Sequence, residues 1–237
     1  MINENRRRFL RQTGAGLAAA GAAGLVLRAD AWPTPAAPDA EEGVRVLLQT
    51  GAPQAVAAPK GELKKTAAMS HGPFYRQGAP FRAKLSPPFE PGTPFVLAGR
   101  VWAFDTKRPL AGVVLDLWHV DHQGKYSTAD GDFKNRGRLL TSESGSYEVE
   151  TVRPIPYQPN PSGSPQFWRC AHFHLLAACP GYKTLVTEIH FQDDPHRKTD
   201  GMFRAELAVA AERRGTAGGQ YERAVFDIVL EPEGSKN

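Results

Sequence analysis

Short apolar runs separated by clusters of turn residues fill the chain from residue 94 onward. The runs are enriched in β-branched and aromatic side chains, which favour strands over helices. Turn residues such as Asp121-His122-Gln123-Gly124 and Pro180-Gly181 separate them. The expected strands cover residues 95–104, 112–118, 147–152, 171–178, 184–191 and 225–230. This pattern predicts an all-β fold, an antiparallel β-sandwich with long loops.

Helical periodicity is convincing only over residues 203–213, and that stretch is brief. Upstream of the strands, residues 32–66 are rich in proline and alanine, which is typical of a linker or an extended arm. The run at 43–48 within it is compatible with a stray strand. We therefore expect one folded domain over residues 67–237.

Residues 1–31 have the pattern of an export signal. Arg6-Arg7 and Phe9-Leu10 precede a Gly/Ala-rich apolar run, and Ala29-Asp30-Ala31 fits a small-x-small cleavage site. The run is too short and too weakly apolar for a transmembrane helix, which needs about 20 apolar residues. The pair of arginines resembles the twin-arginine signal, whose pathway moves folded proteins; a general secretory signal and an uncleaved anchor are the alternatives. We expect a periplasmic or secreted protein with no membrane span in the mature chain.

Composition and charge exclude one class of partner. The hydrophobic content of 41% and the charged content of 23% are those of an ordinary soluble protein, and 20 prolines and 23 glycines suit a loop-rich β fold. The formal net charge is +4, but residues 1–31 carry five arginines against Glu4 and Asp30, so the remainder carries 4 − 3 = +1. Nothing in that remainder resembles a phosphate-binding surface with stacking aromatics, so we expect no nucleic-acid partner.

The two cysteines, Cys170 and Cys179, are not expected to form a disulfide. If the stretch between them is a strand, nine steps of roughly 3.3 Å place them close to 30 Å apart. A disulfide needs Cα atoms within about 7 Å. We therefore predict two free thiols in the monomer.

The most informative segment is Trp168-Arg169-Cys170-Ala171-His172-Phe173-His174. On a strand, His172 and His174 project from the same face about 6–7 Å apart, which lets two imidazoles approach one metal. A lone pair of this kind is more often two satisfied or surface histidines. The apolar neighbours instead imply a strand buried on both faces, where unpaired imidazoles would be costly.

Further metal ligands are scarce in the sequence. There is no cysteine pair with zinc spacing and no HExxH motif, and the position for the acid of a 2-His-1-carboxylate site is occupied by His174 itself. The remaining candidates are Tyr126 and Tyr157, which stand in turns. Taken singly, each tyrosine is more commonly a packing residue.

Taken together, these segments resemble the intradiol ring-cleavage dioxygenases, the family of catechol 1,2-dioxygenase and protocatechuate 3,4-dioxygenase. The resemblance begins at His71-Gly72-Pro73-Phe74-Tyr75 and runs to the last expected strand. Its motifs are Pro109-Leu110-Ala111-Gly112, Trp118…Asp121…Gly124-x-Tyr126, Gly137-Arg138-Leu139-Leu140-Thr141, and the segments with Tyr157 and His172/His174. The expected arm lacks the pattern of the helical N-terminal domain in the catechol 1,2-dioxygenase branch, so an exported short form, closer to the protocatechuate-type architecture, is implied.

The resemblance implies a mononuclear non-haem Fe(III) held by Tyr126, Tyr157, His172 and His174. Tyr157 would also act as a base, and Arg169 matches the active-site arginine that stabilises carbanion character on the bound ring. The implied reaction inserts both atoms of O2 into a catechol-type diol and gives a muconate-type diacid. No external reductant is required.

Three positions depart from the family pattern. Cys170 stands where proline is usual, Glu188 where glutamine is usual, and His190 where tyrosine or asparagine is usual. An acid at 188 would repel a carboxylated substrate, so Glu188, a candidate substrate contact, favours catechol-like substrates. Tyr75 is a second candidate for the substrate pocket, with a structural tyrosine as the equal alternative.

Two other functions remain open on the sequence. One is a non-catalytic periplasmic β-sandwich module that binds a sugar, a peptide or an envelope component, and the other is a different metal hydrolase or oxygenase on the same scaffold. The binding module leaves the four ligand candidates and Arg169 unexplained. An oligomer is compatible with the sequence.

Overall fold

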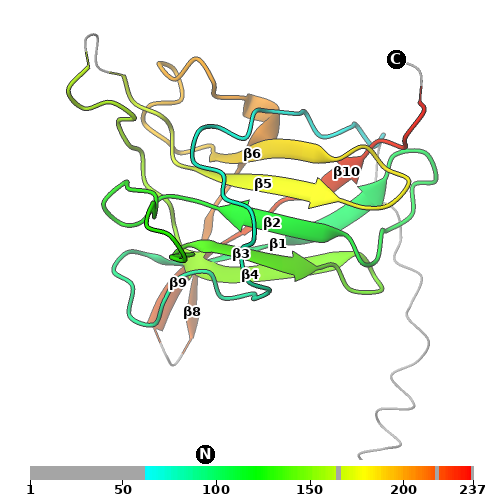
Figure 1. The fold of residues 1–237 in the computed structure, drawn as a ribbon, viewed down its shortest axis with the longest axis horizontal. Helices are drawn as coiled ribbons and strands as arrows, with labels where there is room; N and C mark the ends of the chain where they lie inside the picture. The colour runs from blue at the N-terminus through cyan, green and yellow to red at the C-terminus, as the bar shows by residue number, and fades with distance from the viewer. Residues whose placement is uncertain (1–61, 164–166, 217–218, 236–237) are drawn as a thin grey trace, which may run out of the picture. The chain divides into compact units, whose positions relative to one another are not determined.

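The computed structural model describes residues 62–163, 167–216 and 219–235, and the expected export signal lies outside this part of the chain. The described residues form two β-sheets (Figure 1). The strands are β1 (Pro94–Ala103), β2 (Val114–Trp118), β3 (Arg136–Leu140), β4 (Ser146–Val152), β5 (His172–Ala178), β6 (Leu185–Phe191), β7 (Ala208–Val209), β8 (Glu212–Thr216), β9 (Gly219–Val225) and β10 (Ile228–Leu230).

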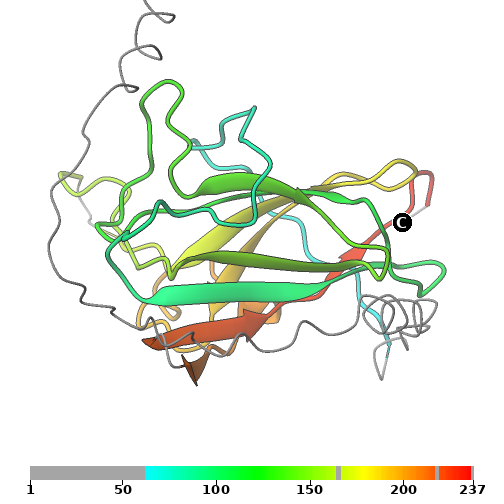
Figure 2. The same ribbon diagram turned by 90° about the horizontal axis from the view of Figure 1, so that it is seen from below.

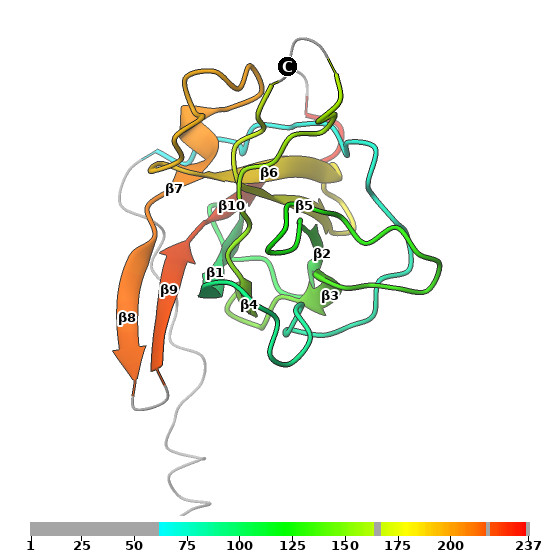
Figure 3. The same cartoon turned by 90° about the vertical axis from the view of Figure 1, so that its left-hand side faces the viewer.

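The first sheet is organised around β1. Strand β4 pairs with it in antiparallel fashion along one edge, and β9 and then β10 pair in parallel with successive parts of its other edge. In Figure 2 the blue-green β1 lies between the yellow-green β4 and the red C-terminal strands. Strand β8 completes this sheet as the antiparallel partner of β9 (Figure 3).

The second sheet has the order β3-β2-β5-β6-β7 and carries the two histidines. Strands β2, β5 and β6 are antiparallel neighbours, and the short β7 is parallel to β6. Along β5, Phe173, Leu175 and Ala177 are fully buried in the core between the sheets, as the period of two requires. On the opposite face, His172 and His174 are also buried, close to the loops that carry Tyr126 and Tyr157.

An aromatic cluster joins the two sheets. The ring of Phe95 on β1 lies 5.6 Å from that of Phe173 on β5 and 5.5 Å from that of Phe191 on β6. These three side chains are at most 1% exposed. Large buried rings contribute strongly to core stability, so this cluster holds β5 and β6 at a defined position under the loops.

The all-β class is confirmed, and the sheets differ from a purely antiparallel sandwich in three parallel pairs. The expected helix over 203–213 is wrong: this stretch contains only a three-residue 3-10 helix, Ala205–Leu207, before β7 and β8. The single strand expected over 225–230 is interrupted at residues 226–227. Both cysteines are free thiols, as expected.

The described end of the expected arm packs on the sandwich. Leu63 is buried against Trp102 and Val229, and the backbone N–H of Thr66 donates to the carbonyl of Val229 at 3.2 Å. Further along, the N–H of Met69 donates to Val186 on β6 at 2.7 Å. The expected linker over 32–61 and its stray strand lie outside the described residues. Among the residues described, no helix has the length and hydropathy needed to cross a bilayer.

Candidate metal centre

The loop-covered face of the second sheet is polar, unlike its core face. The strand register places Trp118 of β2, His174 of β5 and Glu188 of β6 side by side, and it places His172 opposite His190. All five side chains are at most 2% exposed. A row of buried titratable groups on one sheet face marks a candidate functional site.

The fold brings the four candidate ligands together. The Nε2 atoms of His172 and His174 are 3.2 Å apart, and the Tyr126 hydroxyl lies 3.4 Å from His172 Nε2. The Tyr157 ring centroid is 5.7 Å from that of Tyr126 and 5.8 Å from that of His172. These side chains come from β5 and from two loops that are distant in sequence.

Turn chemistry and stacking position Tyr126. The Asp121 carboxylate accepts backbone N–H bonds from Gln123 at 2.8 Å and from Lys125 at 3.0 Å, which fixes the turn just before the tyrosine. The Tyr126 ring then stacks on Phe74 with a centroid distance of 4.4 Å. The motif around residue 71 therefore forms part of the wall of the site.

Tyr157 is positioned by the loop between β4 and β5. Its backbone N–H donates to the Arg169 carbonyl at 3.2 Å, and the Arg169 N–H donates back at 2.9 Å. On its other side, a Cβ added to Gly124 would lie 2.8 Å from Tyr157 Cβ, and Gly124 has a φ of +74°. Only glycine meets both conditions, so the two turn motifs pack directly on each other.

The tautomer of His172 leaves its Nε2 lone pair directed towards His174 Nε2 in the site. His172 Nδ1 donates to the Cys170 carbonyl at 2.6 Å, so its Nε2 carries no proton. Burial, followed by the neighbouring His174, lowers the pKa of His172 well below its ordinary value. Burial lowers the pKa of His174 to about 3, and its Nδ1 has no hydrogen-bond partner. Two neutral imidazoles thus face each other in a dry site.

The two phenols complete a donor set suited to a hard cation. Burial, with Tyr157 as the second cause, raises the pKa of Tyr126 well above its ordinary value, and burial also raises the pKa of Tyr157. Neither phenolate is favourable here without a compensating positive charge. Two imidazole nitrogens and two phenol oxygens in one buried cluster therefore fit a metal ion that binds nitrogen and oxygen ligands.

Arg169 lies between two buried carboxylates. Its Nη2 donates to Glu188 Oε2 at 2.7 Å, and its Nε donates to Asp200 Oδ2 at 3.1 Å. The Glu188 side chain is 1% exposed. His190, opposite His172, has no hydrogen-bond partner on either ring nitrogen, and burial lowers its pKa to about 4. Tyr75 packs against Trp118 and donates its hydroxyl to Asp116 at 3.3 Å.

The sequence interpretation missed two residues that brace the site. Asp200 accepts the backbone N–H of Cys170 at 2.8 Å, and Asp194 accepts that of Ala171 at 2.7 Å. Both are buried and hold the chain just before β5. In the sequence both acids stand in a polar loop, where a solvent-exposed side chain is expected. The only signal for them is that a buried arginine such as Arg169 needs an acidic partner. Trp118, whose ring stacks on His174 at 4.9 Å, was noted only as part of a motif.

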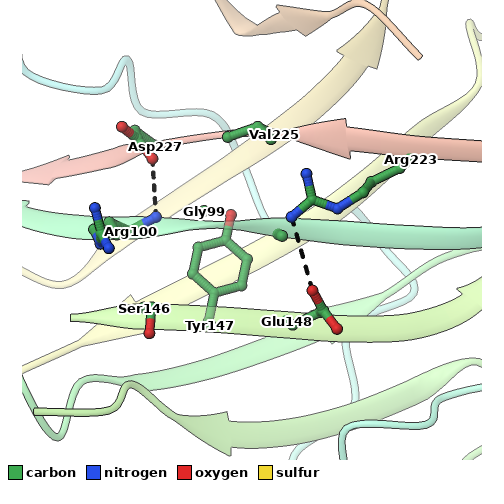
Figure 4. A pocket seen from close by; sticks show the side chains of 9 residues that line it. Gly99, Arg100, Ser146, Tyr147, Glu148, Arg223, Val225 and Asp227 are labelled. Carbon is green, nitrogen blue, oxygen red and sulfur yellow. Dashed lines mark hydrogen bonds and ion pairs between the residues drawn. The ribbon is translucent and has the colours of Figure 1, made fainter. Parts of the chain in front are cut away.

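Two other features of the described surface do not belong to this site. Glu90, Asp121 and His122 cluster, but Lys134 lies among them at 2.9 Å from Glu90 and supplies the positive charge. A hollow on the outside of the first sheet is formed by β1, β4 and the β9–β10 junction (Figure 4). No candidate ligand lines it.

The profile of a protein family described as Dioxygenase matches residues 71–232, which contain all four candidate ligands. The chain belongs to the intradiol ring-cleavage dioxygenases. The family predicted from the sequence is therefore confirmed, and the protein is an enzyme of this oxidoreductase class.

Known proteins support the assignment of this intradiol dioxygenase. A chlorocatechol 1,2-dioxygenase of Rhodococcus opacus is 29% identical over 188 residues, covering 70% of this chain and 72% of the relative. Catechol 1,2-dioxygenase 2 of Acinetobacter lwoffii is 34% identical over 147 residues, which are 56% of this chain and 53% of the relative, so the match spans just over half of that protein. The crystal structure of hydroxyquinol 1,2-dioxygenase from Pseudomonas putida has a TM-score of 0.64 at 30% identity, covering 73% of this chain and 69% of that one.

Proposed function

We propose that this intradiol dioxygenase cleaves a catechol-type aromatic diol between its two hydroxyl groups, with O2 as co-substrate and a muconate-type diacid as product. The observation that carries the proposal is the approach of the His172 and His174 Nε2 atoms to 3.2 Å, with the Tyr126 hydroxyl 3.4 Å from His172 Nε2 and all three side chains buried. The names of the relatives support the same class of substrate.

Tyr126, Tyr157, His172 and His174 would hold a mononuclear non-haem Fe(III). When bound, the ion supplies Lewis acidity that draws electron density from a catecholate and makes the ring reactive towards O2 without an external reductant. Because burial raises the pKa of both phenols, loading the site releases their protons and makes iron binding stronger at higher pH.

Two residues then act on the substrate. Tyr126 is stacked on Phe74, whereas Tyr157 lies beside Arg169 in the loop before β5, and the Tyr157 hydroxyl oxygen is the proposed base for one catechol proton. Arg169 carries a fixed positive charge beside the pocket, which stabilises negative charge that develops on the ring. The two carboxylates on Arg169 orient it and leave it little freedom.

The buried acid at 188 favours substrates without a carboxylate. Arg169, Glu188 and Asp200 carry a formal sum of one negative charge when all three are ionised, and a further anion close to them would be repelled. We therefore propose catechol-like rather than protocatechuate-like substrates, with Tyr75 and Glu188 nearest to the substrate side of the site.

The visible absorption spectrum of the purified protein tests the proposal. We expect a burgundy tyrosinate-to-Fe(III) band that moves to longer wavelength when catechol is added without O2. Tyr126→Phe and Tyr157→Phe should each weaken or remove the band and the activity. A protein that stays colourless after iron reconstitution would contradict the proposed Fe(III) site and its tyrosine ligands.

A further inference from the structure

Glu188 contacts two parts of the site at once. On β6 it stands directly opposite His174 of β5 in the strand register. Its Oε2 atom accepts from Arg169 at 2.7 Å, while its Oε1 atom lies 3.7 Å from His174 Nδ1. The His174 and Glu188 side chains are at most 2% exposed, so water does not compete for these atoms.

Two polar atoms without a hydrogen-bond partner lie near each other in this region. Glu188 Oε1 and His174 Nδ1 are both buried and both without a hydrogen-bond partner. Unpaired buried polar atoms are each unfavourable, and once His174 Nε2 binds a metal its Nδ1 is a donor that matches the Glu188 Oε1 acceptor. His190 is no substitute partner for Oε1, because its Nε2 lies 3.5 Å from Oε2, the oxygen that already accepts from Arg169. The 3.7 Å between Oε1 and Nδ1 exceeds a usual N–H···O distance by only about 0.5 Å.

The nitrogen with which His174 would bind the metal determines which of its two ring nitrogens carries the proton. His174 directs Nε2 towards His172 and the candidate metal position, so a metal-bound His174 carries its only N–H on Nδ1. That N–H needs an acceptor. A carboxylate accepts with both oxygens and can serve His174 and Arg169 together. A glutamine has one acceptor oxygen, and its NH2 group would face a second donor.

We propose that Glu188 is a positioning residue that accepts the His174 Nδ1–H with one oxygen while it holds Arg169 with the other. This role rests on the proposed iron-dependent function. A carboxylate behind a ligating imidazole fixes the ring orientation and increases the basicity of the nitrogen that binds the metal. Glu188 therefore favours Fe(III) over Fe(II), and it ties the position of the active-site arginine to that of a metal ligand.

Glu188→Gln tests this role, because it keeps the shape of the side chain and removes one acceptor. In the iron-loaded protein we expect a 10- to 100-fold loss of Fe(III) affinity, measured by competition with a chelator. We also expect a more positive Fe(III)/Fe(II) midpoint potential, by about 59 mV for each tenfold loss that is selective for Fe(III). The tyrosinate band should persist at saturating iron.

Asp200→Asn is the matched control. Asp200 is the other carboxylate on Arg169, but its hydrogen bonds go to Arg169, Cys170 and Met202 and not to His174. It should leave the midpoint potential near that of the wild type while it lowers turnover. Glu188→Asp keeps the charge but shortens the side chain, and it should also shift the potential because the reach to His174 is lost.

The outcomes separate the two proposals. If the wild-type protein shows the iron band but Glu188→Gln retains its potential and affinity, the positioning role is wrong and the dioxygenase function stands. An equal potential shift in Glu188→Gln and Asp200→Asn would also overturn the role, because the effect would then come from charge around Arg169. A wild-type protein that binds no iron removes both proposals.

Discussion

At the scale of single residues, the site is positioned by contacts between residues that are far apart in the sequence. Gly124 and Tyr157 belong to different loops, and an added Cβ at Gly124 would approach Tyr157 Cβ to 2.8 Å. Arg169 and Glu188 belong to a loop and a strand, and they form an ion pair at 2.7 Å. Small changes at these positions should alter function more than their conservative chemistry suggests.

Gly124→Ala should displace Tyr157. We expect loss of most of the tyrosinate band intensity or a shift of its maximum, together with reduced turnover, because the new Cβ occupies the place of the tyrosine. Gly131→Ala is the control, since Gly131 has the same φ of +74° but nothing within 4 Å of its added Cβ. Both changes should lower the free energy of unfolding by about 1–2 kcal/mol through backbone strain. Equal spectra for the two variants would contradict the contact.

Arg169→Lys should separate catalysis from metal binding. Lysine keeps a positive charge but cannot bind Glu188 and Asp200 with two separate nitrogens of a planar group. We expect turnover to fall by about 10²–10³-fold, the usual effect of removing one electrostatic contact to the transition state. The iron band should remain. Steady-state kinetics and the visible spectrum measured on one preparation decide the matter, and loss of the band together with activity would assign Arg169 a structural role instead.

At the scale of elements, interior polar residues connect the two sheets. His119 follows β2 and is buried, with Nδ1 donating to the Val120 carbonyl at 2.7 Å and Nε2 accepting from the Thr151 hydroxyl of β4 at 2.7 Å. Ser86 also contacts the Thr151 hydroxyl at 2.8 Å. This chain of hydrogen bonds ties the start of the Tyr126 loop to the first sheet.

His119 should contribute to the pH dependence of stability, together with His172, His174 and His190, whose pKa values burial also lowers. Burial lowers the pKa of His119 to about 4 from 6.5, so the unfolded chain binds a proton more readily than the folded one. The stabilisation is therefore complete above about pH 6.5 and is lost as the pH falls towards 4, for a total of about 3 kcal/mol. His119→Gln should flatten this slope in denaturant unfolding measured at several pH values. An unchanged slope would show that other groups dominate in this range.

The strands also show where the local sequence pattern is insufficient to predict secondary structure. The alternation of β5 is readable in the sequence, and the structure confirms a strand with one face in the core and two histidines on the other. The expected strand over 225–230 is broken because β9 and β10 each pair with part of β1, and Phe226 and Asp227 between them contact Ala98 and Arg100. At this junction a Cβ on Gly99 would lie 1.9 Å from the Phe226 carbonyl oxygen. The 203–213 region has a helical pattern, but pairing with β6 and β9 keeps β7 and β8 extended after the short 3-10 helix.

At the scale of the whole molecule, the family match covers residues 71–232, and residues 1–31 lie outside it. We propose that residues 1–31 direct export of the folded, iron-loaded enzyme. Replacement of Arg6 and Arg7 by lysine should retain the protein in the cytoplasm, as measured by cell fractionation. Continued export of the double variant would favour the general secretory route.

The sequence alone determined the features that depend on near neighbours. Period-two alternation, turn residues and the order of the motifs indicated the sandwich class, the buried strand with His172 and His174, and Tyr126 and Tyr157 as candidate ligands. Only the tertiary structure decided how Asp194 and Asp200 meet the start of β5 and how Glu188 meets both Arg169 and His174. The physical reason is that local conformation follows from each residue and its neighbours, whereas these contacts depend on strand register and on how the loops pack over the sheet.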